Sequence, residues 1–291
     1  MRCQGCLLGS APRPRGDAAE GGAPLTSSTP DALWGSPSLQ VLRPAAITCT
    51  NLTRGRLLDR CSLSVPVGMR LLVVSEPEAS GSALIRVLAG LSRPDAGRVE
   101  IAGMTDPSRD GWGRRIAHLG PEPGIHAWMT PREALAVAAD LLELPPAEAG
   151  RRIDRALTWS RIPTESADRP VRRGGPPLFQ RTAFAAALIA DPEVLLLDEP
   201  LRALEAHERS RLLRLPGPRR TIVLASRYPA SEVGLVSHVA LLQHGRVALL
   251  ARTVELESAG LALSLRGVSA LAEMRPAAPG RQTPRDAVVE R

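Results

Sequence analysis

The chain has 291 residues, enough for one sizeable buried core with a subdomain or tails attached. Hydrophobic residues make up 44% of it but aromatic residues only 2%, so the core must consist of Leu, Val, Ala and Ile, which suits an α/β layered fold. The net charge of +7 comes from arginine alone, because the sequence contains no lysine, and this excludes every mechanism that needs a lysine side chain.

Residues 1–44 are rich in Gly, Pro, Ser and Ala without a sustained apolar period, which predicts a disordered tail. Cys3 and Cys6 have the spacing of metal ligands, but no second Cys or His pair stands nearby, so we prefer the tail over a zinc site. The four cysteines are too few for a disulfide scaffold and fit a reduced cytoplasm. No stretch approaches the ~20 apolar residues of a membrane-spanning helix, so a membrane role would need a partner chain.

Between the tails, short apolar runs alternate with helical patterns. Thr130, Pro131 and Glu133 form a capping box that opens a helix. The continuous apolar run at 194–197 is typical of a parallel strand buried on both faces. We expect strands at 70–74, 98–101, 115–119, 194–197 and 221–225, a hairpin at 238–251 that turns at His244-Gly245, and helices at 83–91, 130–144, 152–159 and 179–190.

Two stretches about a hundred residues apart carry a family resemblance. Residues 84–103 look like the helix that follows a phosphate-binding loop, with a Pro-x-x-Gly turn and a strand behind it. Residues 187–200, which end in Leu-Leu-Leu-Asp-Glu-Pro, are similar to a Walker B strand and its preceding helix. Together they resemble the ATP-binding cassette of ABC transporters.

The resemblance implies an α/β fold, a P-loop NTPase (RecA-like) core with a helical subdomain and an antiparallel β subdomain. The cassette would span residues 45–256, with the helical subdomain at about 128–185. Residues 257–291 would be a C-terminal extension, largely disordered from about residue 273.

The metal and water positions of the family look intact. The strand would project Asp198 from its carboxyl end, where Asp198 and Ser82 can hold Mg²⁺, and Glu199 can polarise the attacking water. Arg227 stands where the family has a switch histidine and could still pair with phosphate. The alternative is that Asp198 and Glu199 merely cap a buried strand at the surface.

The phosphate-binding loop has lost its usual residues. Aligned by the family pattern, the cofactor-binding positions fall on Ser75, Glu78, Ser80, Gly81, Ser82 and Ala83. Gly81 replaces the lysine that contacts the β- and γ-phosphates, and serines or glutamate replace glycines whose N–H groups would wrap them. Only Ser82 keeps its role.

Carboxylates in this loop would repel the phosphates of ATP. Glu76 and Glu78 lie where a tetra-anionic ligand would sit, and one like-charge contact near 4 Å costs about 4 kcal/mol at an intermediate dielectric. A helix N-terminus offers only about 0.3–1 kcal/mol per interaction. We therefore hypothesise self-occlusion, in which the Glu78 carboxylate accepts the N–H groups at the start of the helix at Ser82.

The remaining family motifs are also altered. Pro121 replaces the glutamine that senses magnesium, although Glu122 could partly substitute. The signature that faces a partner's nucleotide keeps Gly174 and Gly175 but has Arg173 in place of its serine. Further changes are Glu205 for an aspartate after the Walker B turn, and no aromatic residue near 51–56 to stack adenine.

Two functions stay open. One is an ATP-binding subunit of an ABC transporter with weakened or absent hydrolysis, and the other is a pseudo-ATPase that is a structural or regulatory module of a transporter complex. A different P-loop enzyme, such as a small-molecule kinase, would still want the missing lysine.

The resemblance implies ATP and Mg²⁺ as ligands, although binding is in doubt. It also implies a membrane-spanning permease and a second cassette as partners, at the inner face of the cell membrane. The segment 121–131, with Trp128, would couple to the permease, or would be a packed turn. The arginines are scattered without interleaved aromatic residues, so we expect no nucleic-acid partner.

Overall fold

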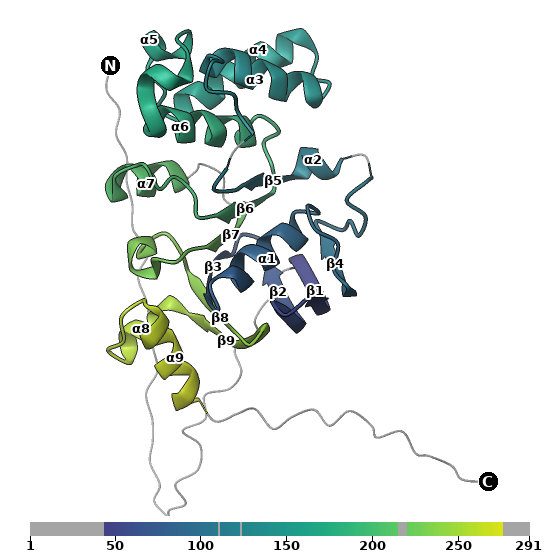
Figure 1. Ribbon diagram of the computed structural model, residues 1–291, viewed down its shortest axis with the longest axis vertical. Helices are drawn as coiled ribbons and strands as arrows, with labels where there is room; N and C mark the ends of the chain where they lie inside the picture. The colour runs from purple at the N-terminus through teal and green to yellow at the C-terminus, as the bar shows by residue number, and fades with distance from the viewer. Residues whose placement is uncertain (1–43, 110, 123, 215–219, 276–291) are drawn as a thin grey trace, which may run out of the picture. The chain divides into compact units, whose positions relative to one another are not determined.

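The computed structural model describes residues 44–109, 111–122, 124–214 and 220–275 (Figure 1). The tails predicted for residues 1–44 and from about residue 273, with the Cys3–Cys6 pair, lie outside the described residues except for Pro44 and residues 273–275, and the helix that ends at Met274 includes residues 273 and 274. The strands are β1 (Ala45–Arg54), β2 (Leu58–Pro66), β3 (Arg70–Glu76), β4 (Ala96–Ile101), β5 (Ile116–Leu119), β6 (Val194–Asp198), β7 (Thr221–Ala225), β8 (His238–Gln243) and β9 (Arg246–Arg252).

Helices cover both sheets and form a layer of their own. They are α1 (Ala79–Leu88), α2 (Trp112–Arg115), α3 (Pro131–Leu141), α4 (Pro146–Trp159), α5 (Thr164–Ala167), α6 (Gly175–Leu188), α7 (Ala206–Leu213), α8 (Thr253–Ser258) and α9 (Leu265–Met274). Two 3₁₀ turns, η1 (Val171–Gly174) and η2 (Pro229–Glu232), precede α6 and follow β7.

The larger sheet has the strand order β5-β6-β7-β3-β8-β9, parallel except for the β8–β9 hairpin. Alternate residues of one strand enter different cores. Leu71 and Val73 of β3 pack with α1, whereas Leu72 and Val74 join the cluster that holds Phe184. Burial on both faces explains the continuous apolar runs of the sequence. The predicted hairpin turn at His244-Gly245 is confirmed, and both residues have positive φ.

The smaller sheet is antiparallel with the order β2-β1-β4, which confirms the expected antiparallel β subdomain. β1 and β2 were not among the predicted strands. The signal was present in β2, because Cys61, Leu63 and Val65 alternate with exposed residues and enter the core. Gly97 follows a tight turn into β4 with φ +91°, and a Cβ there would lie 2.4 Å from the Asn51 carbonyl oxygen.

The helical subdomain is built from α3 to α6 around its own apolar cluster (Figure 1). The capping box of Thr130 and Glu133 is confirmed in both directions. The helix predicted from about residue 179 begins earlier, at Gly175, because two prolines occupy its first turn, where a missing N–H is tolerated.

The helical subdomain is tied to the turn that follows β6. The Ala203 N–H donates to Gln180 Oε1 of α6 at 2.7 Å. The neighbouring Arg181, whose side chain is 13% exposed, pairs with Glu208 of α7 at 2.6 Å. These two contacts fix α6 against the segment immediately after Glu199.

Candidate functional site at the carboxyl edge of the sheet

A pocket of about 330 Å³ lies where β3, β6 and β7 end and α1 begins. The carboxyl edge of a parallel sheet is the usual place for ligand sites in such folds. Its lining residues are Val74, Ser75, Glu78, Ala79, Ser82, Pro121, Asp198, Glu199, Ala225, Ser226, Arg227, Pro229 and Leu265. Most of the residues singled out from the sequence therefore meet here.

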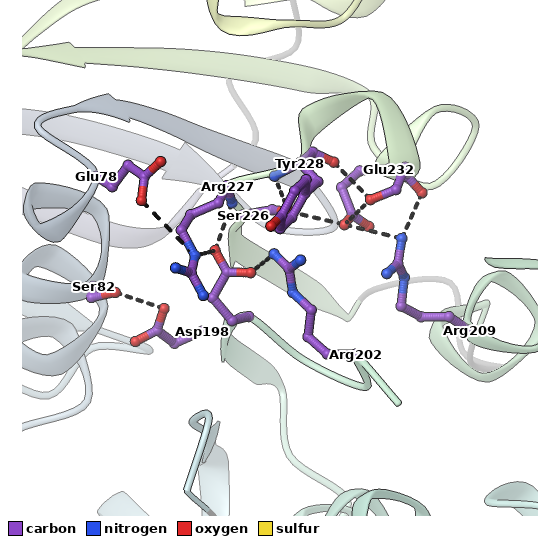
Figure 2. A network of polar contacts seen from close by, with 11 residues as sticks. Glu78, Ser82, Asp198, Arg202, Arg209, Ser226, Arg227, Tyr228 and Glu232 are labelled. Carbon is purple, nitrogen blue, oxygen red and sulfur yellow. Dashed lines mark hydrogen bonds and ion pairs between the residues drawn. The ribbon is translucent and has the colours of Figure 1, made fainter. Parts of the chain in front are cut away.

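The predicted metal pair lies together. Asp198 ends β6 and is 4% exposed, and its Oδ1 accepts a hydrogen bond from Ser82 Oγ of α1 at 2.9 Å (Figure 2). A hydroxyl and a carboxylate oxygen are ligands that Mg²⁺ prefers. This half of the site fits a magnesium ion.

Glu199, the candidate for polarising water, is held by two arginines, Arg202 and Arg227. Its Oε1 accepts the Arg227 backbone N–H at 2.6 Å and lies 3.5 Å from Arg227 Nε. Its Oε2 forms an ion pair with Arg202. The Glu199 side chain is only 10% exposed, so these interactions act in a partly desolvated place. Both oxygens of the Glu199 carboxylate are thus engaged by arginines.

The self-occlusion hypothesis for Glu78 is wrong. Glu78 makes no side-chain bond to the start of α1, and its side chain is 67% exposed with Arg227 Nε 4.0 Å away. The reason lies in where the helix begins, since α1 starts at Ala79 and not near Ala83 as predicted. Glu78 itself has helical dihedral angles, so its side chain points off the helix surface.

Ser75 occupies the position expected of Glu78. Its Oγ accepts the Gly81 N–H at 3.0 Å and donates to the Glu78 carbonyl at 3.0 Å. The N–H groups of Ser80 and Gly81 also bond to the carbonyls of Pro77 and Glu78. Phosphate binding at a loop requires free N–H groups, so this half of the site does not fit the phosphates of ATP.

The other predicted cofactor positions do not reach the pocket. Ser80 is fully buried and its hydroxyl has no partner. Ala83 packs against the core on α1. Gly174 and Gly175 lie at the junction of η1 and α6 in the helical subdomain, where Gly175 has φ +65°.

The segment expected to couple to a permease is partly exposed. Trp128 is 62% exposed and stacks on His126 with ring centroids 5.4 Å apart, so the alternative of a packed turn is wrong for its side chain. Pro121 lines the pocket. Glu122 is exposed, and Glu205 precedes α7 without capping it.

Sequence reasoning missed a buried network beside the pocket (Figure 2). Glu232 of η2 accepts hydrogen bonds from Ser226 at 3.1 Å and Ser231 at 3.0 Å. Arg209 of α7 pairs with Glu232 at 3.2 Å and donates to the Ser231 carbonyl at 2.8 Å. The network fixes the segment that carries Arg227. No local pattern connects Arg209 to Glu232, because the two lie on separate elements 23 residues apart.

The chain was compared with known proteins. The family model described as ABC transporter matches residues 58–202. The aliphatic sulfonates import ATP-binding protein SsuB of Corynebacterium glutamicum is 31% identical over 215 residues, which cover 71% of this chain and 83% of that protein. The sulfate/thiosulfate import ATP-binding protein CysA of Mycobacterium tuberculosis is 33% identical over 200 residues, but the match spans little more than half of it, 55%.

Solved structures agree with the fold. The chain aligns with cbiO1 of Clostridium perfringens, described as part of an ABC transporter complex, with a TM-score of 0.64 at 21% identity over 79% of this chain and 99% of that one. Among the described residues, no helix has the length and apolar character of a membrane span. With its P-loop NTPase fold and Asp198 at the carboxyl edge of the sheet, the chain belongs to the ABC transporter family as an ATP-binding cassette domain.

Proposed function

We propose that the chain is the ATP-binding-cassette subunit of an ABC transporter in which ATP hydrolysis is weakened or absent. The relatives named above are import ATP-binding proteins, which supports the transporter role. The observation that carries the loss of hydrolysis is the state of Glu199, whose two carboxylate oxygens pair with Arg202 and Arg227. A carboxylate whose two oxygens are each paired with a guanidinium group is not free to contact an attacking water and take its proton.

The test compares the purified chain with its Glu199→Gln variant in a magnesium-dependent phosphate-release assay. In a working site, removal of the group that assists proton transfer lowers the rate by about 10²–10⁴-fold. Here we expect the two proteins to release phosphate at the same background rate. A magnesium-dependent turnover that disappears in Glu199→Gln would overturn the proposal.

A second candidate is a pseudo-ATPase, a structural or regulatory module that does not bind ATP productively. The observation that favours it is the loop before α1, where Ser75 and two carbonyls use the N–H groups that a phosphate would need. The two candidates differ in nucleotide affinity. A ligand at about 100 times its dissociation constant stabilises the folded chain by about 2.7 kcal/mol, which a thermal unfolding experiment with millimolar Mg-ATP detects.

An upward shift of the unfolding midpoint that Asp198→Asn removes would favour an ATP-binding subunit. An unchanged midpoint would favour the pseudo-ATPase. In both cases we propose a membrane-spanning permease and a second cassette, identical or different, as partners, and a location in the cytoplasm at the inner face of the cell membrane. The pulldown of a multi-spanning membrane protein from native membranes would test the partner, and recovery of none would count against both candidates.

A further inference from the structure

The segment between β3 and α1 is unusually short for a phosphate-binding loop. β3 ends at Glu76 and α1 begins at Ala79, so only Pro77 and Glu78 connect them. The residues aligned with the family's loop are thus the end of a strand and the first turn of a helix. The groups that bond to the N–H groups of this short connection therefore decide whether a phosphate can bind there.

One hydroxyl bridges both sides of the connection. Ser75 Oγ, on the strand, accepts from the Gly81 N–H and donates to the Glu78 carbonyl, both at 3.0 Å. Gly81 N also lies 3.2 Å from the Glu78 carbonyl oxygen, so its single hydrogen is shared. The serine hydroxyl thereby accepts an N–H bond that an anion could otherwise accept at the start of α1. It also links that helix to the strand.

The same contact restricts position 81. A Cβ built on Gly81 would lie 2.9 Å from Ser75 Oγ and 3.4 Å from the Ala225 Cβ. The first distance is shorter than real Cβ contacts, so a side chain at position 81 requires the Ser75 hydroxyl to move, which disturbs both of its hydrogen bonds. The second is an ordinary van der Waals contact. Ser75 and Gly81 are therefore coupled positions.

We propose that Ser75 is the residue that excludes the phosphates of a nucleotide from this cassette, by bonding to the Gly81 N–H and by occupying the space that a side chain at position 81 would need. The inference rests on the second form of the proposed function, the pseudo-ATPase that does not bind ATP productively, since it names the contact that would deny a nucleotide access to the same site. It predicts that a lysine placed at position 81 restores binding only when the Ser75 side chain is also removed.

The coupling is tested first without a ligand, by thermal unfolding of Gly81→Ala, Ser75→Ala and the double variant. Glycine to alanine within a helix is normally stabilising. With Ser75 present we expect Gly81→Ala to lower the midpoint by about 2–4 °C or more, the size of one lost hydrogen bond in a domain of this length. In the Ser75→Ala background the same change should leave the midpoint unchanged or raise it.

Gly150→Ala is the matched control, because Gly150 lies within α4 and a Cβ there meets nothing within 4 Å. We expect it to leave the midpoint unchanged or raise it in either background. An equal shift for Gly81→Ala with and without the Ser75 hydroxyl would overturn the inference.

A second experiment measures the affinity for Mg-ATP by titration calorimetry, for Gly81→Lys and for the double variant Ser75→Gly/Gly81→Lys. We expect the double variant to bind at least about tenfold more tightly than Gly81→Lys alone. Equal affinity in the two variants, or no binding in either, would overturn the inference. Efficient hydrolysis by the unmodified chain would instead overturn the proposed function, so the two failures are distinguishable.

Discussion

Loss of the Arg209 guanidinium should destabilise the whole fold, because it would leave a carboxylate buried. The side chains of Arg209 and Glu232 are 7% and 3% exposed, and the atoms that pair lie 3.2 Å apart. Removal of one partner of such a pair costs about 3–5 kcal/mol, most of it from the charge left without compensation. Arg209→Met keeps much of the side-chain volume, so this cost is not confused with that of a large cavity.

The assay is urea unfolding followed by far-ultraviolet circular dichroism, with the slope m expected to stay unchanged. The matched control is Arg132→Met. Arg132 is 44% exposed and pairs with the exposed Asp154 and Asp168, so its loss should cost about 1 kcal/mol or less. If Arg209→Met costs no more than Arg132→Met, the network of Glu232 does not stabilise the fold as argued.

Two other predictions concern the β subdomain and the response to pH. Gly97→Ala forces a side chain against the Asn51 carbonyl at positive φ and should cost at least about 1–3 kcal/mol in urea unfolding, whereas a cost near zero would contradict the turn geometry. Burial lowers the pKa of His118 below its ordinary 6.5, so the unfolded chain gains a proton first and stability should fall as pH drops below about 6.5. His118→Gln should reduce this dependence of the free energy of unfolding on pH. The remaining dependence is due to His238, whose pKa is also lowered by burial. An unchanged dependence in the variant would exclude His118 as its source.

Much of the core could be predicted because its signals are local. The run Val194–Asp198 is a buried parallel strand, as its continuous apolar sequence indicates, and Thr130 caps α3 through the predicted reciprocal bonds. In each case a few adjacent residues contain the physical reason, either burial on both faces or a side chain that satisfies free N–H groups. Such signals do not depend on distant parts of the chain.

The prediction of the site failed where tertiary contacts of this chain, and not the family's sequence pattern, decide the structure. The alignment placed a loop at residues 75–83, but Glu78 and Ser80, which stand where the family has glycines, have helical geometry, and α1 begins four residues earlier than predicted. Glu78 was expected to fill the loop, but the Ser75 hydroxyl accepts the Gly81 N–H instead, because α1 begins directly after Glu78. The ion pair of Arg202 with Glu199 follows from the turn after β6, which no periodic pattern describes.

The hydrogen bond and the ion pair that hold α6 against the turn after β6 also connect the helical subdomain to the pocket. Gln180 and Arg181 bond to Ala203 and Glu208, and Ala203 directly follows the arginine that holds Glu199. The backbone next to that arginine is therefore bonded to α6. Because energetic coupling is reciprocal, any ligand that shifted α6 relative to this turn would also alter the pairing of Arg202 with Glu199.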